Sequence, residues 1–397
     1  MFEEIQQLSE ISKKPSRTIV GLMSGTSLDG LDIAVCRFHG SGLETRVELL
    51  NFKTVNYDAE FQNEVKSIFA KETASLLKVT LLNEYIGSCF AELILHSLKE
   101  WNIKTSSVDL IASHGQTIYH APAVRHDLEK YGNATLQIGD GDHIAVKTGI
   151  ITLSDFRQKH IAAGGEGAPL AVYGDFLIFS DPDEKRILLN IGGIANFTFL
   201  PSRSQPEAVF STDIGPGNTL MDQFVQANYP GLRFDKNAEI ASSGTVNETL
   251  LQALFDHPFF QAEVPKTTGP ELFNLDYLNE AIQACGIQNL SNSDVLATLC
   301  RFSALSITNG IEKAIGDEPY VIYLSGGGMY NNLLVEHIKN ELPGLDVKTT
   351  NDLGIDPDAK EAVLFAVLAN ETIAGKQIDF GNGSFPRITM GKISLPG

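Results

Sequence analysis

Short hydrophobic runs recur along the chain and alternate with segments that have helical periodicity. Residues 17–23 (RTIVGLM) and 31–38 (LDIAVCRF) are typical of two strands, and a small polar turn with glycine joins them. Runs of the same kind predict further strands at residues 108–113, 150–154, 186–191, 194–200, 208–213 and 320–325. An alternation of this regularity predicts an α/β fold.

Apolar residues spaced by three and four positions predict helices between these strands. The pattern is clearest at residues 293–316, where Leu296, Cys300 and Ala304 follow one another along one face. Similar spacing predicts helices at residues 83–101 and 358–375.

A pair of strands turned by glycine occurs twice, at residues 17–38 and again at 186–200. With 397 residues the chain is too long for one hydrophobic core. We therefore expect two α/β lobes, residues 1–183 and 184–397, with a cleft between them. The polar cluster SDPDEK at 180–185 predicts the boundary, and the last helix is expected to pack back toward the cleft.

Composition narrows the function classes. Hydrophobic residues make up 43% of the chain and charged residues 20%, which is typical of a globular protein. The net charge of -19 argues against a nucleic-acid partner. The cysteines form no CxxC pair, which favours buried thiols over zinc or disulfides. With neither a signal peptide nor a membrane-spanning run in the sequence, we expect a cytoplasmic protein.

The turn MSGTSLDGLD at residues 23–32 is the first candidate for phosphate binding. Its small side chains would let phosphate oxygens approach the backbone amides and hydroxyls closely. A plain tight hairpin is an equally good interpretation of the same residues. The sequence contains neither a GxxxxGK[ST] motif nor a GxGxxG motif after a strand, which argues against a P-loop or dinucleotide site.

The second half of the chain adds three glycine-rich turns: NIGGIAN at 190–196, DIGPGN at 213–218 and LSGGGMYNN at 324–332. Turns at strand ends can converge on one crevice, where open α/β sheets bind ligands. Asp213 could hold Mg²⁺ directly or through water, or it could cap a turn. The triple glycine would admit a nucleotide base and its sugar, although a plain loop is the alternative.

The segment SDFRQKHIAAGGEGAP at 154–169 is the best candidate for catalysis. Asp155 at a strand end could take a proton from water or a hydroxyl, while Arg157 steadies negative charge. A structural Asp–Arg pair is the alternative. His114 and Gln116, after a buried strand ending at residue 113, could bind sugar hydroxyls, although a lone histidine there is more often structural. Glu361 could reach a substrate from the last helix, or it could belong to a solvated first helical turn.

The order of these segments predicts a two-lobed phosphotransferase that acts by positioning and charge neutralisation. The motifs also resemble those of the anhydro-N-acetylmuramic acid kinases, in the family's order from Thr18 to the end of the chain. The resemblance rests on MSGTSLDGLD, SHGQTIYH, LQIGDG, SDFR…AAGGEGAPL, LNIGGIANFT, STDIGPGN, TTGPELFN, LSGGGMYN and DAKEAVLFA.

This resemblance implies a two-lobed actin-like ATPase fold of the ribonuclease H-like type and a reaction with two coupled parts. Water opens the 1,6-anhydro ring of 1,6-anhydro-N-acetylmuramic acid while O6 takes the γ-phosphoryl group of ATP. The product would be N-acetylmuramic acid 6-phosphate, in peptidoglycan recycling and amino sugar metabolism. ATP and Mg²⁺ are the implied cofactors, and a homodimer is the implied assembly.

By position, Asp155 matches the family's catalytic base and Glu361 a glutamate on the substrate side. The residues expected to bind ATP or its phosphates are Gly25, Thr26, Ser27, Leu28, Asp29, Gly30, Asp32, Gly192, Gly193, Asp213, Gly215, Gly217, Asn218, Gly326, Gly327 and Gly328. Two positions depart from the family's pattern: Glu166 stands where glutamine is expected, and Pro270 where arginine is expected. Residues 1–16 are an extension.

Two alternatives follow from these departures and from the fold. A levoglucosan-type kinase would also open a 1,6-anhydro bridge, and its substrate has no lactyl carboxylate. The loss of a basic residue at Pro270 slightly favours that sugar. An actin-like ATPase working as a chaperone or scaffold would share the nucleotide loops, because a fold alone does not fix a function.

Overall fold

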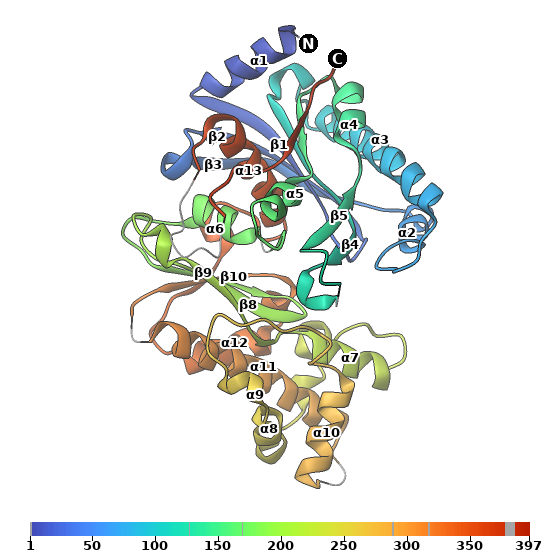
Figure 1. The fold of residues 1–397 in the computed structure, drawn as a ribbon. Coiled ribbons are helices and arrows are strands. Elements are labelled where there is room, and N and C mark those ends of the chain that lie inside the picture. Colours follow the sequence, from blue (N-terminus) through green and yellow to red (C-terminus); the bar gives the residue numbers. More distant parts are fainter. Residues whose placement is uncertain (1, 127, 169, 288–289, 317, 378–385) are drawn as a thin grey trace. The chain divides into compact units, whose positions relative to one another are not determined.

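The structure is a computed structural model that describes all residues except 1, 127, 169, 288–289, 317 and 378–385. The chain forms two compact units (Figure 1). The first contains residues 1–180, 203–208 and 354–397, and the second contains residues 181–202 and 209–353. The predicted lobe boundary at 183/184 lies beside the first change from one unit to the other, and the last 44 residues return to the first unit.

The first unit is built on a mixed sheet. Its strands are β1 (Ser16–Ser24), β2 (Gly30–His39), β3 (Arg46–Asn56), β4 (Leu110–Ala121), β5 (Ala134–Ile138), β6 (Thr152–Ser154) and β12 (Lys392–Ser394). They lie in the order β12-β6-β4-β1-β2-β3, and β5 pairs with β4. The run β1–β2–β3 is antiparallel, whereas β1, β4 and β6 are parallel.

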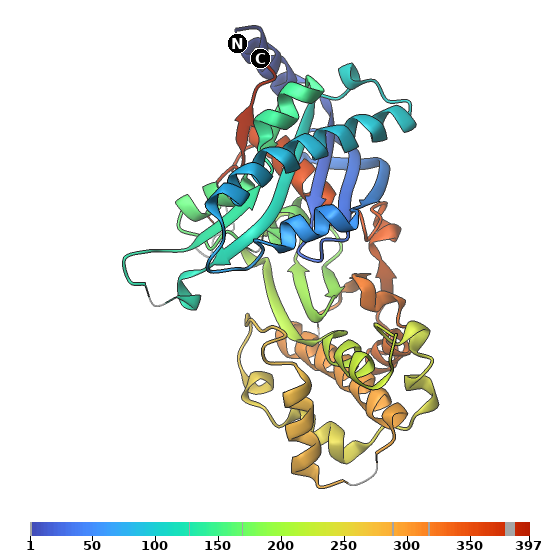
Figure 2. The same cartoon turned by 90° about the vertical axis from the view of Figure 1, so that its right-hand side faces the viewer.

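Helices cover both faces of this sheet (Figure 2). They are α1 (Phe2–Lys13), α2 (Ala59–Lys66), α3 (Leu76–Glu100), α4 (Gly141–Thr148), α5 (Phe156–Ala162), α6 (Ala171–Phe179) and α13 (Lys360–Ala374). Successive residues of a strand point to opposite faces. Val20 and Leu22 of β1 therefore share a core with Ile86 of α3, while Gly21 between them faces α13. A Cβ at Gly21 would lie 2.0 Å from the carbonyl oxygen of Ala362, so only glycine allows α13 to pack this closely.

A buried polar network joins the other end of α13 to the sheet. Arg17 is 2% exposed, and its Nε donates a hydrogen bond to Oδ1 of Asn370 at 2.7 Å. The carboxylate of Glu371 accepts bonds from the Gly42 amide at 2.6 Å and the Thr45 hydroxyl at 2.7 Å. Because buried polar groups are costly to leave unpaired, α13 is an integral part of the first unit.

The second unit is built on a five-stranded sheet: β7 (Arg186–Ile191), β8 (Ile194–Leu200), β9 (Phe210–Pro216), β10 (Val321–Ser325) and β11 (Val347–Thr349). The strand order is β11-β10-β7-β8-β9. Its helices are α7 (Thr219–Asn228), α8 (Glu248–Phe255), α9 (Pro258–Gln261), α10 (Leu275–Cys285), α11 (Asn292–Ile315) and α12 (Asn332–Glu341). Helix α11 supplies Leu296, Cys300 and Ile307 to the core beneath the sheet, as the periodicity predicted.

The two sheets repeat one plan. In each, three antiparallel strands in sequence (β1–β2–β3 and β7–β8–β9) are extended from the first strand by two parallel ones (β4, β6 and β10, β11). This is the plan of the ribonuclease H-like, actin-like fold, and the predicted fold class is confirmed. The cleft expected between the lobes stays a prediction.

One predicted strand end is wrong. The run at 108–113 was expected to stop before His114, but β4 continues to Ala121. Its first part pairs with β1 and β6, Gln116 pairs with both β1 and β5, and the residues after Gln116 pair with β5. His114 and Gln116 therefore lie within a strand, because pairing with β5 extends β4 beyond the residues that pair with β6.

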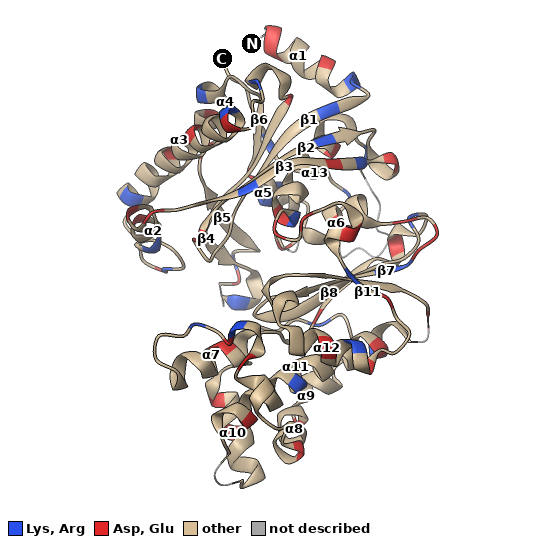
Figure 3. Ribbon diagram, turned by 180° about the vertical axis from the view of Figure 1, so that it is seen from behind, with Lys and Arg blue, Asp and Glu red and all other residues tan. Residues whose placement is uncertain are grey.

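Acidic and basic residues are interspersed along the helices of both units (Figure 3). The net charge of -19 is therefore distributed over the protein rather than concentrated in one segment. Among the described residues, the structure contains no helix with the length and apolar character needed to cross a membrane.

Candidate active site

Asp155 follows strand β6 directly and precedes helix α5. Its backbone is left-handed, with φ 53° and ψ 51°, a conformation that is uncommon outside glycine but tolerated by aspartate. Residues held in such conformations are concentrated at functional sites. The Asp155 carboxylate is 24% exposed and forms an ion pair with Nζ of Lys392. The residue predicted as the base is thus at a strand end and open to solvent.

Arg157, on the first turn of α5, has its guanidinium directed at other partners. Nε donates to Nε2 of His114 at 2.9 Å, and Nη1 donates to the carbonyl of Gly167 at 2.7 Å. Burial first, and then the charge of Arg157, lowers the pKa of His114 to about 3, so the imidazole is neutral. With Nε2 accepting, Nδ1 carries the proton and donates to the Gly115 carbonyl at 2.9 Å. Arg157 thereby connects His114 to the glycine loop after α5.

His160, also on α5, holds the same loop. Its ring is buried, and Nδ1 accepts a hydrogen bond from the Gly167 amide at 2.9 Å. A Cβ at Gly165 would lie 2.2 Å from the imidazole, so glycine is required where the loop crosses the ring. Residues 162–168 (AAGGEGA) are therefore shaped by two side chains of α5, which the sequence alone did not indicate.

A cavity of about 600 Å³ lies beside Asp155. This size suits a small-molecule ligand. Strands β4, β5, β6 and β12 line it together with helix α3 and the start of α4. His114 lines the cavity, as do the carboxylates Asp140 and Asp142. The predicted base and one predicted substrate residue therefore share one cavity.

Gln116 has a different position from the one its predicted role suggests. It is fully buried, and its Oε1 accepts from the Ser24 hydroxyl at 2.5 Å. Its Nε2 donates to the carbonyl of Gly25 at 3.3 Å. Gln116 thus supports the turn between β1 and β2.

That turn has the open character expected of a phosphate-binding segment. Thr26, Ser27 and Asp29 are exposed, while the side chain of Leu28 is buried in the core and anchors the turn. The Ser27 hydroxyl donates to Oδ1 of Asp29 at 2.7 Å. A Cβ at Gly30 would lie 2.7 Å from the Val55 carbonyl, so glycine is needed for close packing on β3.

Asp32 and Glu361 lie in the same electrostatic environment in the first unit. Burial raises the pKa of Asp32 to about 6, and Asp29, Glu361 and Asp358 add to the rise. The Thr54 hydroxyl opposes it by donating to Oδ1 of Asp32 at 2.5 Å. Burial also raises the pKa of Glu361, and the charges of Lys360 and then Arg157 oppose the rise.

The glycine turns of the second unit converge, as predicted. The amides of Gly217 and Asn218 donate to the carbonyls of Gly193 and Gly192, at 2.9 and 2.8 Å. A Cβ at Gly328 would lie 2.2 Å from Cγ2 of Ile191. The turns at 192–193, 215–218 and 326–328 therefore meet around the end of β7.

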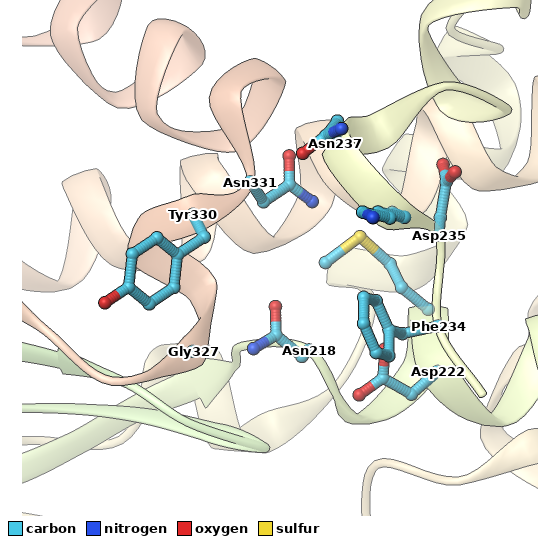
Figure 4. A pocket seen from close by; sticks show the side chains of 10 residues that line it. Asn218, Asp222, Phe234, Asp235, Asn237, Gly327, Tyr330 and Asn331 are labelled. Atoms are coloured by element: carbon cyan, nitrogen blue, oxygen red, sulfur yellow. The ribbon is translucent and has the colours of Figure 1, made fainter. Parts of the chain in front are cut away.

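A pocket of about 390 Å³ opens where these turns meet (Figure 4). Asn218 and Gly327 belong to the predicted turns, and Phe234 and Tyr330 flank the space. Flat apolar surfaces with a few amide groups are what a nucleotide base requires. The lining also includes Met221, Asp222, Asp235, Lys236, Asn237 and Asn331. None of these six residues, nor Phe234 or Tyr330, was predicted as a site residue.

Replacing Asp222 by asparagine is expected to raise the melting temperature at pH 7.5 and to change it little near pH 4. Burial raises the pKa of Asp222 from 3.8 to about 6, so the folded protein binds this proton more tightly than the unfolded chain. The resulting stability is fully present below about pH 4 and is lost as the pH rises through 6. For a partly buried group the loss is about 1 to 2 kcal/mol, and the neutral amide removes it.

Thermal unfolding at the two pH values measures this effect. Asp276→Asn is the matched control, because Asp276 also lies in the first turn of a helix but is exposed. A gain in melting temperature of the same size at both pH values in Asp222→Asn would contradict the explanation.

Asp213 lies on β9, where its Oδ2 accepts a hydrogen bond from the Thr268 amide at 2.9 Å. Burial raises its pKa, and Glu271 adds to the rise. A cation beside the carboxylate would offset this cost. Within the described residues, no three His, Cys, Asp or Glu side chains are grouped closely enough to hold a metal by themselves. A Mg²⁺ ion at Asp213 would therefore need waters or phosphate oxygens as its other ligands.

The fold and the two pockets define a class of protein: an α/β enzyme with repeated sheets and separate candidate sites for a small ligand and a nucleotide. Comparison with known proteins identifies the family. The family model for anhydro-N-acetylmuramic acid kinase matches residues 17–392. The chain belongs to that family and is a phosphotransferase that uses ATP.

The relatives are similar over their whole length. The anhydro-N-acetylmuramic acid kinase of Pseudoalteromonas atlantica is 55% identical, with 100% of both chains covered. The one from Caldanaerobacter subterraneus is 41% identical over 98% of this chain and 100% of its own. Among solved structures, the activator of 2-hydroxyisocaproyl-CoA dehydratase from Clostridium difficile aligns over 90% of this chain and 95% of its own, with a TM-score of 0.42 and 11% identity. So distant a likeness adds nothing to the family assignment.

Proposed function

We propose that this kinase acts on 1,6-anhydro-N-acetylmuramic acid, opens its anhydro ring with water and phosphorylates O6. The product is N-acetylmuramic acid 6-phosphate. The observation that carries this proposal is the position of Asp155, a strained strand-end residue beside a cavity large enough for an amino sugar. The membership of the chain in the kinase family supports the choice of substrate.

Asp155 is the proposed general base. The oxygen of a water molecule attacks the anomeric carbon, and Asp155 takes a proton from that water. The bond between the anomeric carbon and O6 breaks, and O6 forms a bond to the γ-phosphorus of ATP as ADP leaves. A base positioned in this way contributes roughly 10²–10⁴-fold to the rate.

Arg157 and His114 are proposed to act near Asp155, on the side of the sugar where water attacks. Arg157 is fixed by two hydrogen bonds, so its charge is held in place without pairing with Asp155. His114 lines the cavity as a neutral imidazole, which suits contact with sugar hydroxyls. Glu361, exposed at the start of α13, would contact the substrate, and Gln116 would act through the turn that it supports.

The nucleotide is proposed to bind to the glycine-rich turns of the second unit. Its base would occupy the pocket flanked by Phe234 and Tyr330, and its phosphates would contact the turns at 192–193 and 215–218. The turn at 25–30 remains a separate proposed phosphate-binding segment of the first unit. Mg²⁺ bound to the phosphates would neutralise developing charge, and Asp213 would hold it directly or through water.

The cellular setting follows from the reaction. Anhydromuramic sugars come from peptidoglycan breakdown, so the enzyme would serve cell-wall recycling and amino sugar catabolism in the cytoplasm, where ATP is available. We propose a homodimer. Exposed Leu76, Leu77 and Leu81 on α3, at 78, 68 and 58% exposure, provide an apolar surface consistent with self-association.

The test is ADP release from Mg–ATP with three sugars run in parallel: 1,6-anhydro-N-acetylmuramic acid, levoglucosan and N-acetylmuramic acid. The expected product, identified by mass spectrometry, is heavier than the first sugar by one phosphoryl group and one water. The same assay without Mg²⁺ should show little turnover. Activity on levoglucosan alone would show that the protein is a kinase with a different substrate. No ADP release with any of the three sugars would contradict the proposal.

A further inference from the structure

Lys392 is brought to the candidate base by strand pairing. β12 pairs antiparallel with β6, and the register sets Lys392 opposite Ser154, the residue before Asp155. The Lys392 ammonium forms an ion pair with Oδ2 of Asp155. It remains 66% exposed, so it is free to exchange partners. A residue 237 positions away in the chain is thus the direct charge partner of Asp155.

The cavity beside Asp155 has an unusual charge balance. Among the described residues that line it, Lys392 is the one lysine or arginine, and the lining also includes the three carboxylates Asp140, Asp142 and Asp155. His114 brings no charge, because burial and Arg157 lower its pKa to about 3. Without Lys392, a negatively charged ligand in this cavity would meet only like charge and neutral groups.

We propose that Lys392 is a specificity-determining residue that binds the carboxylate of an acidic anhydrosugar. The inference rests on the proposed function, in which Asp155 is the base. In the free enzyme Lys392 pairs with Asp155. When the sugar's carboxylate enters the cavity, the ammonium moves to it, and Asp155 is left to accept the proton of the attacking water.

The chemistry of lysine suits this exchange. Its ammonium is a compact charge on a flexible four-carbon stem, so it can move from one carboxylate to another. An exposed ion pair contributes little to stability, so moving the ammonium away from Asp155 costs little. A neutral sugar has no carboxylate to attract the ammonium, so Lys392 would stay paired with Asp155. Lys392 would therefore favour acidic over neutral anhydrosugars in both binding and turnover.

The test compares two sugars that differ in the lactyl carboxylate: 1,6-anhydro-N-acetylmuramic acid and 1,6-anhydro-N-acetylglucosamine. Lys392→Met keeps the length of the side chain and removes its charge, whereas Lys392→Arg keeps the charge. Losing a hydrogen bond to a charged group should raise KM for the acidic sugar roughly 10- to 100-fold in Lys392→Met. The preference for the acidic sugar should disappear with it, while Lys392→Arg should keep most of that preference.

Lys147→Met is the matched control, because Lys147 forms an exposed pair with Glu92 at 3.6 Å in the same unit and does not line the cavity. Calorimetric binding of both sugars to each variant separates this inference from the proposed function. If the wild type binds the acidic sugar more tightly and Lys392→Met does not, the inference stands even where turnover fails. Equal preference in wild type and Lys392→Met, with normal melting temperatures, would overturn it.

Discussion

Replacing Asp155 by asparagine is expected to slow turnover roughly 10²–10⁴-fold while ATP still binds. The amide cannot take a proton from water, yet it has the size of the carboxylate. Asparagine also tolerates the left-handed backbone found at this position, so the variant should fold normally. Single-turnover rates measure the loss, and calorimetry with a non-hydrolysable ATP analogue measures nucleotide binding.

Asp276→Asn serves again as the control, since Asp276 is exposed and lies in the other unit on α10. Near-normal turnover by Asp155→Asn would contradict the assignment of the base. Glu361 and Asp32 would then be the next candidates for the base, because burial raises the pKa of both of these carboxylates in the first unit.

Gly217→Ala should both destabilise the second unit and weaken ATP binding at least tenfold. The new Cβ would lie 2.3 Å from the carbonyl oxygen of Gly192, which is backbone and has little freedom to move. Relief of the clash would separate the turns joined by the Gly217 and Asn218 amides. Overpacking and lost hydrogen bonds together amount to about 3 kcal/mol. Thermal unfolding and ATP titration measure the two effects.

Gly193→Ala is the matched control for stability. Its Cβ would lie 3.7 Å from Cβ of Thr219, an ordinary contact, so the melting temperature should stay close to that of the wild type. A wild-type melting temperature in Gly217→Ala would contradict the close packing of Gly217 against the Gly192 carbonyl.

Much of the fold could be predicted because the buried strands and helices are clearly more apolar than the segments that join them. The predicted strands at 186–191 and 194–200 match β7 and β8, whose residues are largely buried. Strand β3 was missed because none of its residues is fully buried, so its sequence has little alternation. Helix α3 begins at Leu76 rather than 83, since the exposed Leu76, Leu77 and Leu81 obscure its amphipathic pattern.

The candidate site residues also differ in how far the sequence predicts them. Glycine turns and the strand-end Asp155 carry local signals, and the structure brings the turns of the second unit together. Lys392 carries no such signal, because a lysine on a short terminal strand is typical of a solvated surface. Tyr330 ends a short 3-10 helix inside the predicted segment 324–332, whereas Phe234 lies far from it in the chain, and only the tertiary fold brings both to one pocket.

The return of the last 44 residues to the first unit affects the order of events during translation. Residues 181–353 leave the ribosome before α13 and β12 exist, so the second unit can fold first, apart from the segment 203–208 that belongs to the first. The sheet of the first unit cannot complete its packing until α13 emerges and covers the face that contains Gly21. A chain cut short before α13 would therefore contain the pocket of the second unit but not Lys392 beside Asp155. If the proposed nucleotide site is correct, such a fragment would bind ATP but lack the completed site at Asp155.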